Sequence, residues 1–312
     1  MFATFDLAAF EGARGAERAK LAAAIDRICR ETGFLVLTGH GVPQVVIEAV
    51  WQVAQAFFAE SPAVKQQVAA PYAGYPYGYL GPNTESLAKS RGEETPPDLK
   101  ESFNGGPLTV PDGISDRDAH AFCYQPTLWP DMVGFRPAWE VYYTAMEDLA
   151  ARIMVGFAAA LDLPEDHFAP YIDAPISALR ALNYPATQDV PLERQQRAGA
   201  HTDYGSLTIL LPQAGSRGLQ IFLPEQDWID VPAPEGAFVI NIGDLMARWT
   251  SDRWVSTLHR VVAQPDQPAR QSLAFFHQPN WDAVIAPLDG SDSYPPVKSG
   301  RYLMEKFRAT GN

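Results

Sequence analysis

The sequence predicts a mainly β protein with helices, in which a two-sheet core is flanked by N-terminal and central helices. Short apolar segments separated by proline- and glycine-containing turns follow one another from residue 177 to 281. The long helical patterns all lie before residue 177. Because strands do not alternate with helices, a βαβ sheet is disfavoured and a sandwich or double-sheet jelly roll is favoured.

The N-terminal elements are expected to alternate between strand and helix. Residues 2–7 predict a short strand. Residues 16–32 predict a helix, because apolar residues recur at helical spacing: Leu21, Ala24, Ile25 and Ile28. Residues 33–42 predict a strand closed by a glycine-rich turn, in which His40 is interpreted as a structural histidine. Residues 43–70 predict a second helix.

The middle of the chain changes character. Residues 71–117 show no periodicity and are rich in proline, glycine, tyrosine and charged residues, which predicts a long functional loop. Its aromatic residues argue against disorder. Residues 127–162 predict the longest helix, with an apolar stripe from Trp139 to Phe157 that we expect to face the core.

The remaining elements are short strands and two short helices. The predicted strands are 179–185, 201–211, 218–223, 227–231, 237–244, 256–262 and 270–276. The short helices are expected at 245–249 and after residue 295. We therefore predict an N-terminal region (1–176), a core (177–281) and a C-terminal extension (282–312) that form one structural unit.

Two strands carry side chains with metal-binding and carboxylate-binding chemistry. His201 and Asp203 open one of them, and the two-residue alternation of a strand would place them on one face, as two-thirds of a facial triad for Fe(II). His259 lies in a second strand. Arg270 and Ser272 share a face of a third, where a guanidinium fork and a hydroxyl make a good carboxylate clamp.

Each of these residues has an ordinary alternative when taken singly. His259 reads equally well as a strand histidine bonded to a backbone carbonyl, Arg270 as a surface arginine paired with an acid, and Ser272 as a solvated serine. Only their combination, in this order, points to a common site.

Together, His201-x-Asp203, His259 and Arg270-x-Ser272 resemble the motif set of the Fe(II)/2-oxoglutarate-dependent dioxygenases. The flanking sequence is similar to the isopenicillin N synthase-like branch. The resemblance implies a double-stranded β-helix core, Fe(II) bound by the two histidines and the aspartate, and O2 as co-substrate. It also implies that Arg270 and Ser272 hold the distal carboxylate of 2-oxoglutarate.

The same resemblance assigns weaker roles to further residues. Tyr184 matches a tyrosine that hydrogen-bonds the oxoacid, whereas Leu182 replaces an asparagine that plant members use. Arg180 shares the face of Tyr184 and is a candidate for a substrate carboxylate, the alternative being an ion pair outside the pocket. In the family, the 71–117 region passes the mouth of the site, so Phe103 and Asn104 are candidate substrate contacts, the alternative being surface packing.

The function implied is oxidation of a C–H bond of a small molecule by hydroxylation, desaturation or cyclisation, with release of succinate and CO2. Two alternatives of the same fold stay open, because relatives of both kinds retain Arg-x-Ser: an iron oxidase that does not use 2-oxoglutarate, and an ethylene-forming enzyme. A non-catalytic metal- or ligand-binding module is the alternative of another class. The intact triad disfavours it, because such a module needs no open coordination position.

The composition of the chain limits the kinds of partner that it can bind. The 312 residues are 46% hydrophobic and carry a net charge of −13, which disfavours binding to nucleic acid or to anionic membranes. We expect no secretion signal and no membrane span. The two cysteines do not form a CxxC pair. These features predict a cytoplasmic enzyme whose partner is a small-molecule substrate; its oligomeric state has no signal in the sequence.

Overall fold

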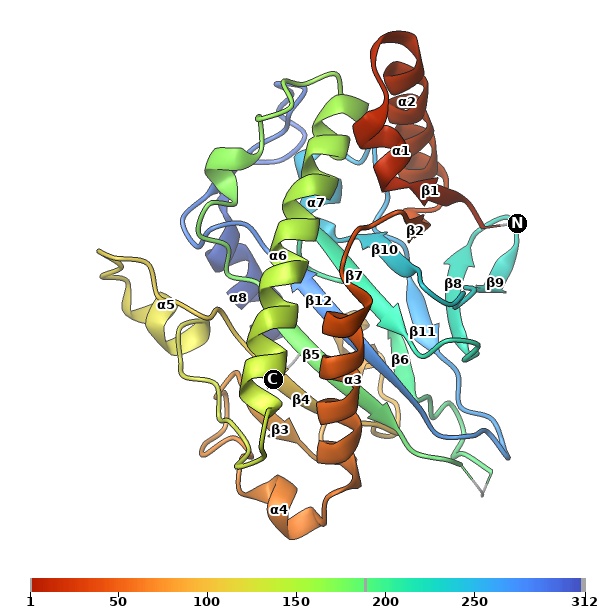
Figure 1. The fold of residues 1–312 in the computed structure, drawn as a ribbon, viewed down its shortest axis with the longest axis vertical. Coiled ribbons are helices and arrows are strands. Elements are labelled where there is room, and N and C mark those ends of the chain that lie inside the picture. The colour runs from red at the N-terminus through yellow and green to blue at the C-terminus, as the bar shows by residue number, and fades with distance from the viewer. Residues whose placement is uncertain (1, 188–189, 310–312) are drawn as a thin grey trace.

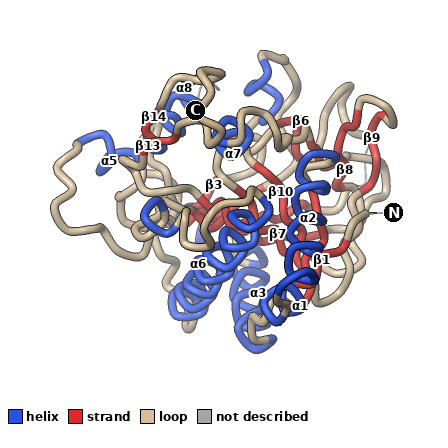
Figure 2. Tube along the Cα trace, turned by 90° about the horizontal axis from the view of Figure 1, so that it is seen from above, coloured by secondary structure: helices blue, strands red, loops and turns tan. Residues whose placement is uncertain are grey.

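The computed structural model describes residues 2–187 and 190–309. Two β-sheets dominate it, with long helices packed against the outer face of the larger one (Figure 1, Figure 2). The helices are α1 (Leu7–Gly12), α2 (Gly15–Glu31), α3 (Gln44–Ala59), α4 (Pro62–Gln66), α5 (Arg117–Phe122), α6 (Phe135–Ala160), α7 (Asp244–Trp249) and α8 (Ser299–Ala309), with two short 3-10 helices, η1 (Leu87–Arg91) and η2 (Ala169–Tyr171).

The larger sheet has eight strands and combines the N-terminal region with the predicted core. Its spatial order is β1-β2-β10-β7-β12-β5-β4-β3. These strands are β1 (Thr4–Asp6), β2 (Phe34–Thr38), β3 (Gly78–Leu80), β4 (Glu101–Gly105), β5 (Ala178–Tyr184), β7 (Leu207–Pro212), β10 (Phe238–Ile242) and β12 (Arg270–His277). The N-terminal region therefore supplies both edges of this sheet.

The smaller sheet faces the larger one and has the order β6-β11-β8-β9. Its strands are β6 (Ala198–His201), β8 (Leu219–Leu223), β9 (Asp227–Asp230) and β11 (His259–Val261). A separate hairpin joins β13 (Val284–Ile285) to β14 (Val297–Lys298). The two facing sheets form the predicted double-stranded β-helix, or jelly roll.

Apolar residues fill two layers. The larger layer lies between the eight-stranded sheet and the helices, where Phe103, Phe135 and Trp139 are completely buried. The smaller layer lies between the two sheets and includes Leu182 and Tyr184. The long helix predicted at 127–162 forms as α6, but it begins at Phe135 and ends at Ala160; its apolar stripe faces the core as expected.

Two predicted elements of the N-terminal region differ from the structure for identifiable reasons. The helix expected at 43–70 breaks between α3 and α4, where Ser61 caps a new helix whose first residue is Pro62. Proline lacks an N–H and cannot continue the preceding helix. The long loop expected at 71–117 contains β3, η1 and β4. The two strands lie at one edge of the sheet and are too short to show a period.

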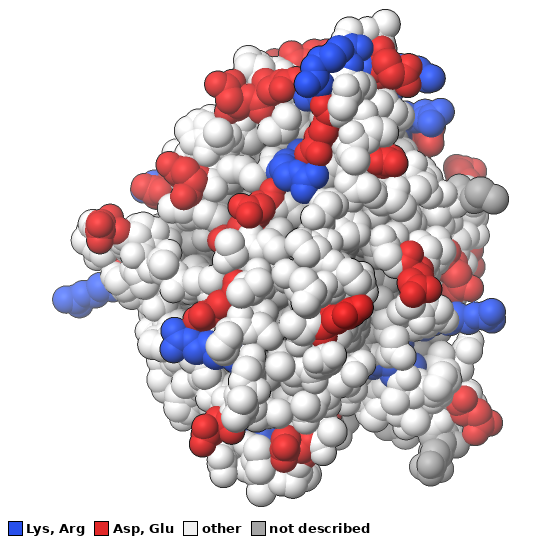
Figure 3. Space-filling model, viewed as in Figure 1, with Lys and Arg blue, Asp and Glu red and all other residues white. Residues whose placement is uncertain are grey.

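The outer surface over α3 and α6 is mostly uncharged, with acidic and basic side chains scattered across it (Figure 3). Within residues 2–187 and 190–309, no helix has the length and apolar character needed to cross a membrane.

Candidate active site

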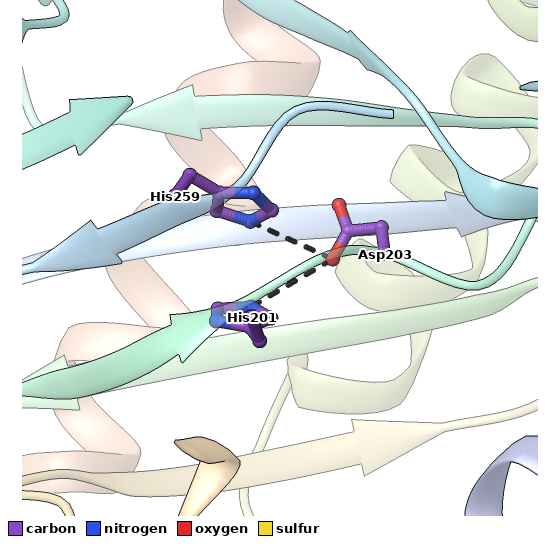
Figure 4. Close-up of side chains that lie close together, drawn as sticks. All are labelled: His201, Asp203 and His259. Carbon is purple, nitrogen blue, oxygen red and sulfur yellow. Dashed lines mark ion pairs between the residues drawn. The ribbon is translucent and has the colours of Figure 1, made fainter. Parts of the chain in front are cut away.

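Three candidate metal ligands converge at neighbouring strands of the smaller sheet. His201 ends β6 and His259 begins β11, and the two residues are direct partners in the antiparallel ladder. Asp203 follows just after β6. Its Oδ1 lies 3.8 Å from Nε2 of His201 and 3.7 Å from Nε2 of His259 (Figure 4). One ligand atom from each residue lies within 4.8 Å of the other two.

Asp203 reaches this position from a turn, which corrects the prediction of a continuous strand over residues 201–211. The chain leaves the smaller sheet after His201 and enters the larger sheet at Leu207. Because the two sheets face each other, the backbone must turn to cross between them. The two side chains therefore meet through this turn and not through strand alternation.

Backbone carbonyls set the direction of both imidazole rings. Nδ1 of His201 lies 2.7 Å from the carbonyl oxygen of Gly199, and Nδ1 of His259 lies 3.0 Å from that of Thr257. A carbonyl only accepts, so each Nδ1 carries the proton. Each Nε2 then faces Asp203, and in the neutral form of the ring it offers a lone pair there, which is how metal-binding histidines are commonly oriented.

Two polar side chains hydrogen-bond the Oδ2 atom of the Asp203 carboxylate. The Asn241 side chain donates to Oδ2 over 2.7 Å, and the Thr208 hydroxyl donates to the same oxygen. Burial acts to raise the pKa of Asp203, but the adjacent imidazoles and these two donors outweigh it and lower the pKa below its ordinary value. The carboxylate is therefore ionised, with Oδ1 directed to the imidazoles.

The charge state of His201 also suits metal binding. Burial, together with the neighbouring ring of His259, lowers the pKa of His201 to about 3. The imidazole is therefore neutral at physiological pH and can act as a ligand. Two nitrogens and one oxygen with no sulfur fit the ligand set of a non-haem Fe(II) centre. Among the described residues, this is the one group of three that could hold a metal ion in this way.

A buried cation lies on the inner face of the larger sheet. Arg270 is only 4% exposed, and its guanidinium lies 5.0 Å from the centre of the Tyr184 ring. Its Nη1 donates to the Arg217 carbonyl over 3.3 Å, but within the described ranges it forms no ion pair and its Nε has no hydrogen-bond partner. Burial lowers the pKa of Arg270. A buried guanidinium without a counter-charge is costly unless an anion joins it, so this position fits a carboxylate ligand.

The other two residues of the predicted oxoacid site lie beside Arg270. Tyr184 is its direct partner across β5 and β12, and Ser272 follows two residues later on the same face of β12. Both are almost fully buried. Leu182 is the partner of Ser272, so an apolar side chain stands where plant members of the resembled family have asparagine.

Arg180 also points into the space between the sheets, but it is already paired. Both carboxylate oxygens of Glu85 lie 3.2 Å from its Nη1. Glu85 is in turn 3.5 Å from the buried ammonium of Lys100. The predicted alternative, an ion pair with an acid, is therefore present, although it lies inside the jelly roll and not outside it.

The two candidates from β4 separate onto opposite faces. Asn104 is the direct partner of Arg180 and is buried, and its Oδ1 accepts no hydrogen bond from any residue the structure describes. Phe103 points the other way, into the helix-facing core against Phe57 and Trp139. Adjacent strand residues face opposite sides, so Phe103 is structural packing and does not join the predicted site.

Sequence reasoning missed several buried polar residues around the triad. Thr208 and Asn241 are direct partners across β7 and β10, and both contact Asp203. A polar residue at an inward position of an otherwise apolar strand was the available signal for each. Asp98 and Lys100, in the region predicted as a long loop, are also almost completely buried, and Asp98 contacts β6.

Comparison with protein families identifies two separate regions of the chain. Residues 175–279 match the model described as the 2OG-Fe(II) oxygenase superfamily. Residues 3–132 match the model described as the N-terminal region of non-haem dioxygenase in morphine synthesis.

Individual relatives are similar over nearly the whole chain. The 2-oxoglutarate-Fe(II) type oxidoreductase hxnY of Emericella nidulans is 33% identical, over 94% of this chain and 85% of its own. Validamycin A dioxygenase of Streptomyces hygroscopicus subsp. limoneus is 31% identical, over 96% and 84%. A full-length Neurospora crassa protein, crystallised in complex with alpha-KG and thymine, superposes with a TM-score of 0.84 at 29% identity, covering 99% of this chain and 97% of that one.

Proposed function

The chain belongs to the 2OG-Fe(II) oxygenase superfamily, and from this membership we propose which of its residues carry out the reaction. It is a 2-oxoglutarate-dependent dioxygenase that uses Fe(II), 2-oxoglutarate and O2 to oxidise a small molecule. The bound iron couples the decarboxylation of 2-oxoglutarate to succinate and CO2 with oxidation of a substrate C–H bond.

We propose that His201, Asp203 and His259 hold the iron. The proposal is supported by the two imidazoles, whose Nδ1 atoms donate to backbone carbonyls and whose Nε2 atoms point towards one carboxylate oxygen. It is also supported by Asn241, which occupies the other oxygen and leaves Oδ1 for the metal. Three protein ligands leave positions free for the oxoacid and O2.

We propose that Arg270, Ser272 and Tyr184 bind the distal carboxylate of 2-oxoglutarate. The single observation that carries this assignment is the buried Arg270 guanidinium, which pairs with no acid in the described part of the chain. A bound carboxylate would supply the missing counter-charge. Leu182 removes one polar contact that plant members have, so Arg270 carries a larger share of the affinity here.

We propose that Arg180 and Asn104 line the substrate side of the pocket and favour a polar substrate. Both lie on the inner face of the larger sheet, on the side of Leu182 away from Tyr184. The unpartnered oxygen of Asn104 can accept a hydrogen bond from a substrate N–H or O–H. The names of two relatives fit this class, because validamycin A and thymine are both polar small molecules.

The test measures succinate released from 2-oxoglutarate by purified protein with Fe(II) and O2. We expect Asp203→Ala and His259→Ala to abolish release. Arg270→Met should raise the KM for 2-oxoglutarate by about 10- to 100-fold, the range for losing a charge-assisted hydrogen bond. If the wild type releases no succinate without its substrate, the dissociation constant of 2-oxoglutarate is measured anaerobically on the Co(II)-loaded proteins and compared between wild type and Arg270→Met.

Arg260→Met is the matched control. Its guanidinium also lies over an aromatic ring, 4.0 Å from the centre of Trp228, but it bonds to Gln220 on the outer side of β11. We expect its KM for 2-oxoglutarate to stay within about twofold of the wild type. An Arg270→Met enzyme with a wild-type KM would contradict the clamp assignment.

We propose a cytoplasmic location and a small-molecule substrate as the partner of this enzyme. We place the enzyme in the cytoplasm, supported by Cys29 and Cys123, which are both buried free thiols. The net charge of −13 supports the expectation that nucleic acids and anionic membranes are not partners.

A further inference from the structure

The Asp98-Leu99-Lys100-Glu101 segment carries three buried charges at the start of β4. Asp98 is 2% exposed, Lys100 3% and Glu101 7%. Burying a charge is costly unless it is paired and hydrogen-bonded. A segment that buries three charges is therefore held by specific partners, and those partners indicate what the segment does.

The partners divide the segment into two halves. Glu101 faces away from the iron site, where Lys65 pairs with it over 2.8 Å and Asn183 donates to its other oxygen. Asp98 and Lys100 pair with each other over 2.9 Å, and Asp98 contacts β6. The two halves are chemically alike, because each is a buried carboxylate paired with a buried lysine, but only one touches a strand that carries a proposed iron ligand.

Asp98 is connected to His201 through a single residue. Its Oδ1 accepts the backbone N–H of Gly199 over 3.0 Å. The carbonyl of the same Gly199 accepts the Nδ1 proton of His201 over 2.7 Å. Glycine has the least restricted backbone of any residue, so its conformation must be fixed from outside. Asp98 supplies that restraint on the residue that directs the His201 ring.

Asp98 also connects helix η1, in the 71–117 region, to Gly199. Its Oδ2 accepts the N–H of Leu87, the first residue of η1, over 3.2 Å. This helix packs so closely on β6 that a Cβ on Gly199 would lie 2.8 Å from the backbone nitrogen of Ala88. Asp98 thus bonds the chain on both sides of this contact.

We propose that Asp98, held in place by Lys100, is a positioning residue of the iron centre. It fixes the backbone at Gly199 and thereby the direction in which Nε2 of His201 meets the metal. This inference rests on the proposed role of His201 as an iron ligand. Hydrogen-bond partners of metal ligands typically contribute about 10- to 100-fold to metal affinity, and Asp98 fixes such a partner, the Gly199 carbonyl.

The test compares Asp98→Asn with Glu101→Gln. Each variant neutralises one carboxylate beside a buried lysine in the same segment, so each loses folding stability. Metal affinity is measured by calorimetric titration of the metal-free protein with Co(II), and thermal unfolding of the metal-free protein is measured alongside. We expect Asp98→Asn to weaken Co(II) binding by about tenfold or more, and Glu101→Gln to change it by less than about twofold.

A double variant separates the hydrogen bond from the charge. In Asp98→Asn, the lysine cation attracts the amide oxygen, which turns the amide nitrogen towards the N–H of Gly199. In Asp98→Asn/Lys100→Met that attraction is gone, and the single amide oxygen is divided between the N–H groups of Gly199 and Leu87, so it can again accept from Gly199 part of the time. We therefore expect the double variant to bind Co(II) more tightly than Asp98→Asn but less tightly than the wild type, whatever its melting temperature.

His201→Ala separates a failure of the proposed iron site from a failure of the positioning role of Asp98. If it leaves Co(II) affinity unchanged, the proposed iron site itself is wrong. If it abolishes binding while Asp98→Asn binds Co(II) as tightly as Glu101→Gln does, the site stands and the positioning role of Asp98 is overturned.

Discussion

Glu85 is the residue that balances the positive charges of Arg180 and Lys100. Its carboxylate lies between Arg180 and Lys100 and is mostly buried. Burial acts to raise the pKa of Glu85, but the Arg180 guanidinium and the Lys100 ammonium outweigh it and lower the pKa from 4.5 to about 2. Arg180 therefore meets a substrate as half of an ion pair and not as a free cation.

This lowered pKa predicts a pH-dependent stability. A carboxyl whose folded pKa is depressed stabilises the protein above its unfolded value of 4.5, and this contribution is lost as pH falls towards about 2. Its full size is about 3 kcal/mol. The free energy of unfolding in urea should therefore differ most between wild type and Glu85→Gln at pH 7, and the difference should shrink towards about pH 3.

Glu165→Gln is the control for this experiment. Glu165 also pairs with an arginine, Arg18, but its side chain is 59% exposed. Exposed pairs contribute little, so we expect a difference from wild type below about 1 kcal/mol at every pH. A Glu85→Gln deficit that stays the same size from neutral to acidic pH would contradict the charge-based explanation.

At the scale of elements, α8 covers the turn that carries Asp203. Lys306 pairs with Asp244 over 2.7 Å, and the backbone N–H of Asp244 donates to the carbonyl of Asp203 over 2.7 Å. The Thr202 hydroxyl also donates to Asp244. Phe307 packs its ring 5.5 Å from that of Tyr204. Helix α8 thus contacts Tyr204 directly and is linked to Thr202 through Asp244.

Lys306→Met should loosen this helix locally. The variant removes the ion pair with Asp244 but keeps an apolar stem of similar length, so we expect faster amide hydrogen exchange in α8 and in residues 202–205. Exchange in β12 should be unchanged, because local opening does not require global unfolding. Lys298→Met, at an exposed position of β14, is the control and should leave α8 as in the wild type. Equal exchange in both variants would show that Lys306 does not hold the helix.

Elements with a strong period could be predicted, whereas boundaries set by tertiary contacts could not. The stripe from Trp139 to Phe157 identifies α6 because every third or fourth residue is buried. The break after α3 was signalled by Ser61-Pro62. No local pattern predicts that β3 and β4 join the sheet, because β3 pairs with β4, and the other partner of β4, strand β5, lies far along the chain.

At the scale of the whole molecule, ligand binding should stabilise the fold by mass action. Co(II) at about 100 times its dissociation constant adds about 2.7 kcal/mol, which corresponds to about 4 °C for a chain of this length. We expect 2-oxoglutarate to raise the melting temperature further and by a larger amount when Co(II) is present. Asp203→Ala should lose the response to Co(II); a full response in that variant would argue against the triad as the metal site.

The metal-binding residues could be predicted because His201-x-Asp203 and His259 follow one another in a recognisable order. His201, Asp203 and His259 meet as expected, although Asp203 arrives by a turn. The supporting residues were not predictable, because Asp98 and Gly199 lie 101 residues apart in the chain and only the folded sheet brings them together. Phe103 failed as a site residue because strand alternation turns it to the helices.

We propose that residues 1–176, 177–281 and 282–312 form one structural unit, and the shared sheet supports this. Strand β4 from the first segment pairs with β5 from the second along its whole length, Glu101–Gly105. One end of this pairing lies beside the buried charges of Asp98 and Lys100. Both edge strands of the larger sheet, β1 and β3, come from the first segment.

The close approach of η1 to Gly199 therefore constrains how such enzymes can recombine. A crossover at residue 176 between this chain and a relative would separate Ala88 and Asp98 from Gly199, which lie on opposite sides of the junction. A parent with a larger side chain at the position of Gly199 would collide with the inherited η1. Shuffled offspring should retain activity only where residues equivalent to 88, 98 and 199 come from one parent, so these positions form a unit of inheritance that the linear order of the chain does not reveal.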